Sequence, residues 1–265
     1  MADVFSAELA GKVVVVSGIG PGLGRAIALA CADAGAQVVV AARTEERVAE
    51  LAEELRARGT PARGVVADIT EASDRSALVA TTLDEFGRVD ALVNNAFVMG
   101  PMARADATEP EQWRAVFEVN VIGTVMLSTA FADAMRTTGG GSIVMINSQA
   151  ARRGAARRGP YAASKAALLV AAQVLATEFG PEGIRVNSVV PGQIWGGALE
   201  AHYEALAERR GIAIADVIAQ VTRDIPLRQI TSAEEIASAV VFLLSDRSAA
   251  ITGQSLDVNG GNWFH

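Results

Sequence analysis

A phenol and an ammonium group stand four residues apart in the alanine-rich stretch GPYAASKAAL, residues 159–168. If this stretch is helical, Tyr161 and Lys165 lie on one face, one turn apart. A free tyrosine has a pKa of about 10, and lowering it to about 7 needs roughly 4 kcal/mol in favour of the phenolate. One cation at about 4 Å supplies an energy of that size at an effective dielectric constant of about 20, before desolvation is counted. The pair could therefore exchange protons near neutral pH.

The segments that would position this pair follow a repeating strand and helix pattern. Short β-branched runs end at a glycine or a polar residue, and each is followed by apolar residues at helical spacing. Because such runs are apolar throughout, they indicate parallel strands covered by helices on both faces. We therefore predict a single-domain α/β Rossmann fold with a doubly wound parallel sheet over residues 1–265. The expected strands are residues 12–18, 37–43, 63–69, 90–96, 141–148 and 184–191.

Residues 193–228 interrupt this rhythm with helical pieces instead of a strand. In doubly wound folds ligands bind beyond the carboxyl ends of the strands, and segments inserted there often cover them. The sequence therefore predicts a helical substrate lid over residues 193–228.

Composition narrows the class of partner and the compartment. The chain has a net charge of −7, so it offers no general positive field for nucleic acid or an anionic membrane surface, and a small molecule is the expected ligand. Cys31 is the only cysteine, which excludes an intrachain disulfide and favours the cytoplasm. No basic leader and no uninterrupted apolar run of about 20 residues is present, so no membrane span is expected. His202 and His265, with one cysteine, offer no cluster of metal ligands.

A glycine-rich turn lies between the first expected strand and the first expected helix. The stretch SGIGPGLG, residues 17–24, carries glycines at every second position from residue 18. Glycines there permit positive φ angles and let backbone N–H groups approach a pyrophosphate at the helix start. A tight turn alone would need no cofactor, but its place in the first strand and helix unit favours dinucleotide binding.

The end of the second expected strand, VVVAAR, bears on the choice of nucleotide. An acid expected there to bind the ribose hydroxyls of NAD is replaced by Ala42, and Arg43 follows. A guanidinium without an acid suits a 2′-phosphate, so we predict that NADP(H) is preferred and that NAD(H) is possible. The alternative is that Arg43 only caps a solvated strand end.

The glycine loop and Tyr161-x-x-x-Lys165 together resemble the short-chain dehydrogenase/reductase family over nearly the whole chain. The family's glycine signature TGxxxGxG matches residues 17–24 with serine in place of threonine. Its NNAG motif matches residues 94–97, where Phe97 replaces the glycine. The stretches RVNSVVPG and ITGQSLDVNGG also resemble later landmarks of the family.

The resemblance implies an active-site tetrad and a role for each member. The family's helix asparagine matches Asn120, and its active-site serine matches Ser148, 13 positions before Tyr161. By this resemblance Tyr161 exchanges a proton with the substrate oxygen, and Lys165 tunes Tyr161 and holds the nicotinamide ribose. Ser148 would hydrogen-bond the substrate oxygen, and Asn120 would hold water that connects Lys165 to solvent.

The same resemblance implies contacts along the cofactor. Asp68 and Ile69 match the pair that contacts adenine, while Asn95 and Ala96 would lie along the cofactor. The residues expected to bind it are Ser17, Gly18, Gly20, Gly22, Leu23, Gly24, Arg43, Asp68, Ile69, Asn95, Ala96, Tyr161, Lys165, Pro191, Gly192 and Ile194.

Three departures from the family pattern bear on the substrate. Phe97 is bulky where relatives are small, so its ring must enter the substrate cavity or the core, and we favour the cavity. Gly196 stands where many relatives have a threonine, which makes Trp195 a candidate lid residue that contacts substrate. Four arginines at residues 152–158 could receive an anionic group, or they could form a solvated loop or a subunit contact.

The expected function is an NAD(P)-dependent oxidoreductase that interconverts a ketone and a secondary alcohol, with a Tyr acid/base and an apolar substrate. A 3-oxoacyl-thioester reductase of the same family is one alternative, and the arginine loop is its support. A non-catalytic dinucleotide-sensing module is another, although such a module would be expected to lack part of the tetrad. The resemblance also implies a homotetramer or dimer, with the small alanines of the Tyr161 helix at a close interface.

Overall fold

The β-branched runs form one parallel sheet in the computed structural model, which describes residues 8–264. The strand order is β3-β2-β1-β4-β5-β6-β9, which confirms the predicted Rossmann fold. Ser17 at the end of β1 pairs with Asn94 at the end of β4, and this is the point where the strand order reverses. The strands are β1 (Val13–Ser17), β2 (Gln37–Ala42), β3 (Ala62–Val66), β4 (Ala91–Asn94), β5 (Gly141–Ile146), β6 (Ile184–Pro191) and β9 (Ser255–Val258).

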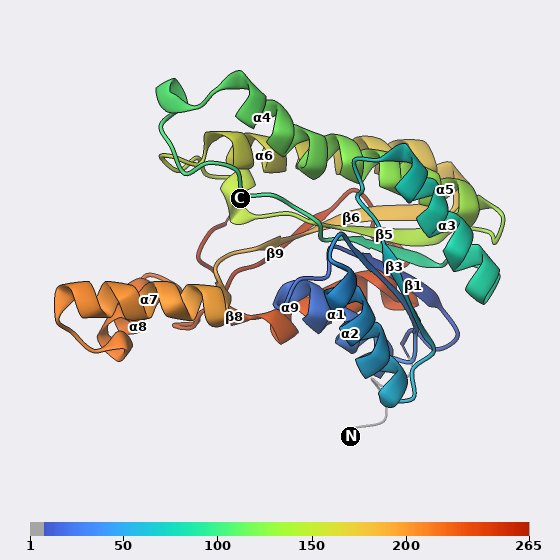
Figure 1. Cartoon of the computed structure of the whole chain (residues 1–265), viewed down its shortest axis with the longest axis horizontal. Coiled ribbons are helices and arrows are strands. Elements are labelled where there is room, and N and C mark those ends of the chain that lie inside the picture. The colour runs from blue at the N-terminus through green and yellow to red at the C-terminus, as the bar shows by residue number, and fades with distance from the viewer. Residues whose placement is uncertain (1–7, 265) are drawn as a thin grey trace.

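Helices cover both faces of this sheet (Figure 1). Because alternate residues of a strand point to opposite faces, Val14 and Val16 join one buried cluster and Val15 joins the other. The first cluster is covered by α1 (Leu23–Asp33), α2 (Glu45–Ala57) and α9 (Ala233–Leu244), and the second by α3 (Ala72–Phe86), α5 (Thr124–Arg136) and α6 (Gly159–Phe179).

Two helical stretches, Pro110–Arg136 and Gly159–Glu182, are long and apolar enough to cross a membrane by length and composition alone. The first joins α4 (Pro110–Phe117) through a π-helix, Glu118–Gly123, to α5, and the second contains α6. Leu127 and Phe131 of α5 are fully buried against the sheet, as is Leu168 of α6 at 1% exposure. Part of the apolar character of both helices therefore comes from the faces that pack against the sheet.

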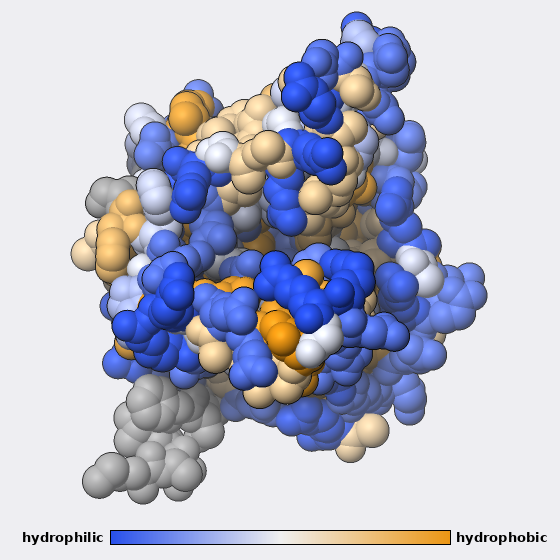
Figure 2. All heavy atoms as spheres, turned by 90° about the vertical axis from the view of Figure 1, so that its left-hand side faces the viewer, coloured by the Kyte–Doolittle hydropathy of each residue, from blue (hydrophilic) through white to orange (hydrophobic). Residues whose placement is uncertain are grey.

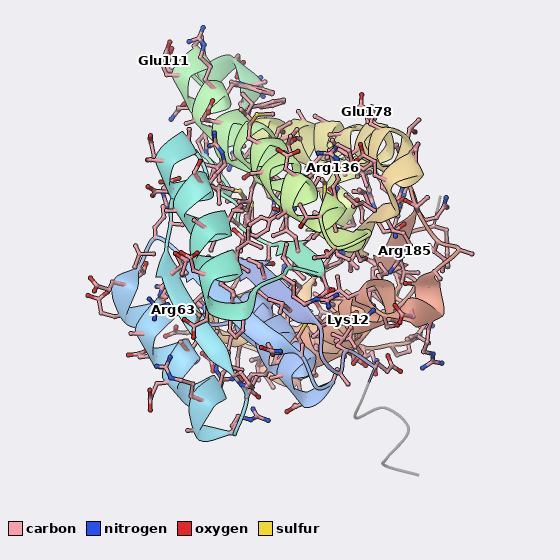
Figure 3. All side chains as sticks on the ribbon, turned by 90° about the vertical axis from the view of Figure 1, so that its right-hand side faces the viewer. Lys12, Arg63, Glu111, Arg136, Glu178 and Arg185 are labelled. Carbon is pink, nitrogen blue, oxygen red and sulfur yellow. The ribbon has the colours of Figure 1, made fainter. Side chains whose placement is uncertain are left out.

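The far ends of these two helices are held together by one arginine. Arg136 at the end of α5 donates from Nε to a carboxylate oxygen of Glu182 at 2.5 Å. Its guanidinium also lies 5.3 Å from the ring centroid of Phe179, the last residue of α6. Figure 3 shows Arg136 and Glu178 at this end of the helix pair, so α5 and α6 are fixed relative to each other.

The segment predicted as a lid forms an arm that projects beyond the sheet (Figure 1). The arm consists of α7 (Gly197–Arg210) and α8 (Ile214–Thr222), which pack around Tyr203, Ala207 and Val217 in a small core of their own. A two-residue parallel pair, β7 (Ile194–Trp195) with β8 (Thr231–Ser232), holds its base. Figure 2 faces this end of the molecule, where the surface is hollowed above the arm. That the arm closes over substrate stays a prediction.

Candidate active site

The candidate residues from separate parts of the sequence meet at one edge of the sheet. Ser17 ends β1, Arg43 follows β2, Asp68 follows β3, Asn95 follows β4 and Ser148 follows β5. Since all strands are parallel, these carboxyl ends lie on the same side, which is where doubly wound folds bind ligands.

Helix α6 brings Tyr161 and Lys165 to this edge. Pro160 stands in the first turn, where a residue without an N–H donor suits a helix start, and the helix then runs unbroken to Phe179. Both side chains point into the protein, since Tyr161 is 7% exposed and Lys165 only 3%. The Lys165 Nζ lies 6.0 Å from the centroid of the Tyr161 ring.

Ser148 lies near the Tyr161 phenol and lowers its pKa. The Ser148 Oγ accepts a hydrogen bond from the backbone N–H of Ala150 at 3.1 Å, which fixes the turn after β5. Burial is the largest influence on the pKa of Tyr161 and raises it, while Ser148 and the charge of Arg158 lower it in part. The phenol therefore carries its proton at neutral pH in the cofactor-free protein.

Lys165 is the most strongly perturbed cation of the site. Its Nζ donates to the backbone carbonyl of Ile146 at 2.8 Å, and burial lowers the pKa of the ammonium to about 7. The attraction between Lys165 and Tyr161 would favour the phenolate if neither group lost its hydration. In the structure, burial is the largest influence on both pKa values: it raises that of Tyr161 and lowers that of Lys165. The phenolate therefore needs further positive charge or hydrogen bonding to be favoured.

Asn120 lies in the π-helix, a local widening that often marks functional sites. Its amide accepts from the Val98 N–H at 2.8 Å and donates to the Val98 carbonyl at 3.0 Å. It also donates to the Ser164 Oγ at 3.0 Å, and Ser164 in turn donates to the Tyr161 carbonyl at 2.8 Å. Ser164 was not predicted as a site residue, although its place between Tyr161 and Lys165 was a signal.

Phe97 lies beside the Tyr161 and Lys165 pair and not in the core. Its ring centroid is 6.1 Å from that of Tyr161 and 5.6 Å from the Lys165 Nζ. Half of the side chain, 50%, is exposed. The replacement of the family's glycine therefore adds an apolar surface next to the phenol.

The glycine loop is closely packed on one side and open on the other. Gly18 has φ +92°, and a Cβ built on it would lie 2.2 Å from the Ala96 nitrogen. A Cβ on Gly24 would lie 2.4 Å from the Gly18 carbonyl oxygen, so these two glycines permit close packing of β1, β4 and α1. Nothing lies within 4 Å of a Cβ on Gly20 or Gly22, so the outer side of the loop is open.

The residues expected to contact the adenosine end of the cofactor lie close to one another. Arg43 is 67% exposed and its guanidinium is 3.7 Å from a carboxylate oxygen of Asp68, a loose ion pair. The other Asp68 oxygen accepts from the N–H and hydroxyl of Thr70. Arg25, the basic residue nearest the glycine loop, is bound by Glu54 of α2. Ile69 is buried beside the π-helix, where a Cβ on Gly123 would meet its carbonyl at 3.0 Å.

Residues after β6 form the wall nearest the arm. A Cβ on Gly192 would lie 3.0 Å from the Asn259 Cβ, so this wall is closely packed. Ile194 and Trp195 form β7, and the Trp195 ring lies 6.4 Å from that of Tyr203 in the core of the arm. Trp195 thus packs on the arm, while Gly196 directly precedes α7 and a Cβ on it would meet nothing within 4 Å.

The arginine loop divides into two halves. Arg152 donates to an Asp257 carboxylate oxygen at 3.0 Å and to the Ser255 Oγ at 2.8 Å, both on β9. The Arg153 guanidinium lies 5.3 Å from the Trp263 ring centroid. These two residues join the loop after Ser148 to the C-terminal segment, a structural contact that the sequence did not reveal.

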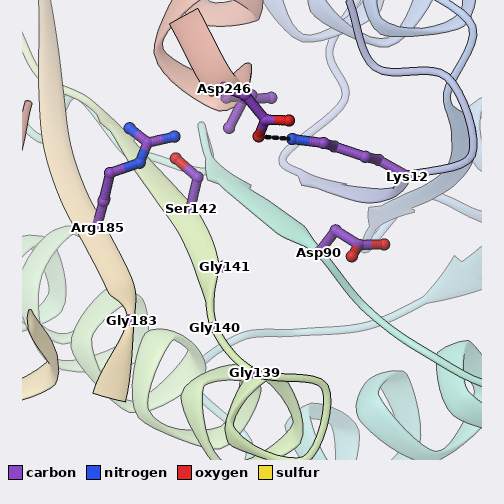
Figure 4. Close-up of a pocket in the computed structure, with 10 residues that line it drawn as sticks. Lys12, Asp90, Gly139, Gly140, Gly141, Ser142, Gly183, Arg185 and Asp246 are labelled. Atoms are coloured by element: carbon purple, nitrogen blue, oxygen red, sulfur yellow. Dashed lines mark hydrogen bonds and ion pairs between the residues drawn. The ribbon is translucent and has the colours of Figure 1, made fainter. Parts of the chain in front are cut away.

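Two cavities in the described part of the chain lie away from this edge. One, of about 280 Å³, lies at the opposite, amino ends of the strands (Figure 4). Lys12 is paired there with Asp246 at 2.5 Å, and Arg185 donates to the backbone carbonyls of Leu243 and Ser245. Because its charged groups already have partners, this cavity shows no sign of ligand chemistry.

Within the described residues no group of three or more His, Cys, Asp or Glu side chains could hold a metal ion. His202 lies on α7, with its ring 5.7 Å from that of Tyr203. His265 lies outside the described residues.

Comparisons with known proteins agree with this geometry. The family described as enoyl-(acyl carrier protein) reductase, a branch of the short-chain dehydrogenases and reductases, matches residues 18–262. The chain belongs to the short-chain dehydrogenase/reductase family. A short-chain reductase protein of Streptomyces niveus, NovJ, is 36% identical over 94% of this chain and 93% of its own length.

Two solved structures resemble this member of the family closely. NAD⁺-bound xylitol dehydrogenase has a TM-score of 0.87 at 29% identity and covers 96% of this chain and 99% of its own. A variant of actinorhodin polyketide ketoreductase with NADPH has a TM-score of 0.86 at 30% identity and covers 97% and 98%. The chain is therefore an NAD(P)-dependent oxidoreductase that acts on CH–OH groups.

Proposed function

We propose that this protein interconverts a ketone and a secondary alcohol and that Tyr161 exchanges the proton with the substrate oxygen. The observation that carries the proposal is the buried Tyr161 phenol, with Ser148 near it and Lys165 one helical turn away. NAD(P)(H), when bound, supplies or accepts the hydride. Because burial keeps the phenol protonated, Tyr161 is ready to donate its proton to a carbonyl that becomes an alkoxide.

The neighbouring residues support this proton transfer. The Ser148 hydroxyl hydrogen-bonds the same oxygen and stabilises the charge that develops on it. Lys165, held by the Ile146 carbonyl, is the cation that favours the phenolate left after transfer. Asn120 fixes the helix around Ser164 and Lys165 through its bonds to Val98 and Ser164, and we assign it the water that returns a proton.

The cofactor would lie across the carboxyl ends of β1 and β4. The open side of Gly20 and Gly22 and the N–H groups at the start of α1 would hold the pyrophosphate, with Ser17, Gly18, Leu23 and Gly24 beneath it. Asp68 and Ile69 would contact the adenine. Asn95, Ala96, Pro191, Gly192 and Ile194 would line the nicotinamide end, next to Tyr161 and Lys165.

The proposed substrate is apolar around its reacting carbon. Phe97 presents its half-exposed ring beside the Tyr161 phenol, and Met99 is also exposed close to it in sequence. We propose that the arm of α7 and α8 closes toward this surface with Trp195 at its base. Reduction of a panel of ketones, followed by absorbance of the reduced cofactor, tests this function, and no turnover of any ketone or alcohol would contradict it.

A 3-oxoacyl-thioester reductase is the second candidate, since the matched family carries an acyl carrier protein in its description. Two arginines of the loop that supported it are bound by Asp257 and Trp263, which leaves fewer cations for a carrier. A thioester substrate in the same panel separates the two candidates. We assign the enzyme to the cytoplasm, where the buried thiol of Cys31 stays reduced.

We predict a preference for NADP(H), because Ala42 leaves the end of β2 without a carboxylate and the Arg43 guanidinium is free enough to bind a 2′-phosphate. Arg43→Ala should lower kcat/KM with NADPH by about 10-fold or more and change kcat/KM with NADH less than about threefold. Arg47→Ala, an exposed arginine on α2, is the matched control and should change neither value. A clear advantage for NADH in the parent enzyme would contradict the preference.

We propose that a second copy of the chain covers the outer face of α5 and α6. Val170 is 59% exposed and Val174 48% on α6, and Met126 is exposed on α5 across a groove of about 490 Å³. Ala163 and Ala167 continue the Val170 and Val174 stripe at helical spacing and are small enough for close approach.

Val170→Asp with Val174→Asp should therefore convert a dimer or tetramer to a smaller species in light scattering, because two charges would be buried in the contact. Met102→Asp, a change at a similarly exposed residue in the segment between β4 and α4, should leave the mass unchanged. A monomeric parent protein would contradict the proposal.

A further inference from the structure

Arg157 and Arg158 form the half of the arginine loop that has no partner. Neither guanidinium makes a hydrogen bond, ion pair or ring contact with another residue of 8–264. Arg157 is exposed and has a left-handed backbone with φ 66°. Arg158 is half-buried directly before α6, three residues from Tyr161.

The Arg158 charge reaches the reaction centre. It is one of three influences that act on the Tyr161 phenol, with burial and Ser148. A half-buried guanidinium is less screened by water than an exposed one, so its field on a neighbouring group is stronger. A positive charge therefore lies close to the place where the substrate oxygen would exchange a proton with Tyr161.

The nearby carboxylates are already engaged elsewhere. Helix α4 packs on the start of α6, where a Cβ on Gly159 would meet the Trp113 ring at 3.1 Å. On that side Glu111 is bound by Arg114 at 2.6 Å, and Glu109 takes part in the cap of α4. On the other side Asp257 is bound by Arg152. The charge of Arg158 is therefore left for a ligand.

We propose that Arg158 binds an oxyanion substituent, a carboxylate in the first instance, on the substrate whose carbonyl receives the proton of Tyr161. This inference rests on the proposed function and narrows its substrate to an apolar oxo acid or hydroxy acid. The Phe97 ring would contact the apolar body, and the Arg158 fork would form two charge-assisted hydrogen bonds to the carboxylate. The carboxylate takes no part in the redox step and stays unchanged in the product.

Matched pairs of substrates test this inference in the holoenzyme. We would measure kcat/KM for 2-oxo-4-phenylbutanoate and 4-oxo-4-phenylbutanoate, for their methyl esters, and for a phosphonate analogue. The parent enzyme should prefer at least one acid to its ester by about 10-fold or more, and Arg158→Gln should remove most of that preference. Arg158→Lys should keep part of the preference for acids, because the ammonium carries the same charge but cannot form two parallel hydrogen bonds to the carboxylate. A preference for the phosphonate would assign a phosphate ester in place of the carboxylate.

Arg157→Gln is the control, since it removes the neighbouring charge and should leave the ratio of acid to ester unchanged. An equal loss for acids and esters in Arg158→Gln would overturn the inference, because the residue would then act on Tyr161 and not on the substrate. Turnover of esters with no preference for acids would also overturn it and leave the proposed function intact.

A binding measurement covers the case in which no ketone is reduced. Calorimetry with 4-phenylbutanoate and the enzyme loaded with NADP⁺ should show binding that weakens about 10-fold or more in Arg158→Gln and falls with added salt. Binding without turnover would retain the anion site and contradict the proposed reaction. No binding by the parent protein, or equal binding by the variant, would overturn the site.

Discussion

Replacing Tyr161 by phenylalanine should lower kcat for ketone reduction by about 10³-fold, which is the usual size of a lost general acid. The phenol is the buried proton carrier of the site, and the change removes only its hydroxyl. A loss of that size corresponds to about 4 kcal/mol of transition-state stabilisation. The ring remains, so its packing against Phe97 is kept and the fold should be preserved.

The chain offers its own matched control, because Tyr203 is its only other tyrosine. Tyr203 is 3% exposed and donates to the Gln193 Oε1 at 2.6 Å in the arm. Tyr203→Phe removes the same group at a similar depth and should change kcat only a few-fold. Fluorescence titration with NADPH should give similar Kd values for both variants and the parent. If Tyr161→Phe turned over ketones as fast as the parent, the assignment of the proton donor would be wrong.

The strands were predictable because a strand that is buried on both faces is apolar at nearly every position. Runs such as the four valines of β1 have no polar face, and their alternation between two buried clusters follows from strand geometry. β9 was not predicted as a strand, since its sequence SLDV carries a charge that Arg152 neutralises. Arg152 lies about a hundred positions before β9 in the sequence, so no local sequence pattern shows that this charge is neutralised.

The sequence indicated which residues form the candidate site, but not which partners they have there or how deeply they are buried. Spacing and strand ends indicated which residues would meet, because parallel strands present their carboxyl ends at one edge. The division of the four arginines was not visible, since Trp263 and Asp257 meet the loop only through the fold. The depth of Lys165 was also not visible, because the burial of one side chain depends on every element packed around it. Its pKa of about 7 is therefore a property of the fold and not of the YxxxK motif.

This burial predicts how stability depends on pH. In the folded, cofactor-free protein the pKa of Lys165 is about 7, while an unfolded lysine has a pKa of about 10.4. Between these values the unfolded chain binds more protons at Lys165, so the free energy of unfolding should rise with pH. The gain from pH 7 to pH 8.5 should be roughly 1.5 kcal/mol. Cys31 and Tyr161, whose pKa values burial raises, oppose this only near and above the pKa of a free thiol, about 8.5.

Urea unfolding at a series of pH values and one protein concentration measures this slope. Lys165→Met should flatten the profile, because it removes the group whose proton is lost on folding and keeps an unbranched side chain in its place. Lys12, the only other lysine, is partly exposed and paired with Asp246, so Lys12→Met should change the stability without changing the slope. If the parent and Lys165→Met gave the same dependence on pH, the ammonium would not be desolvated as the fold requires. The electrostatic account of the Tyr161 and Lys165 pair would then fail with it.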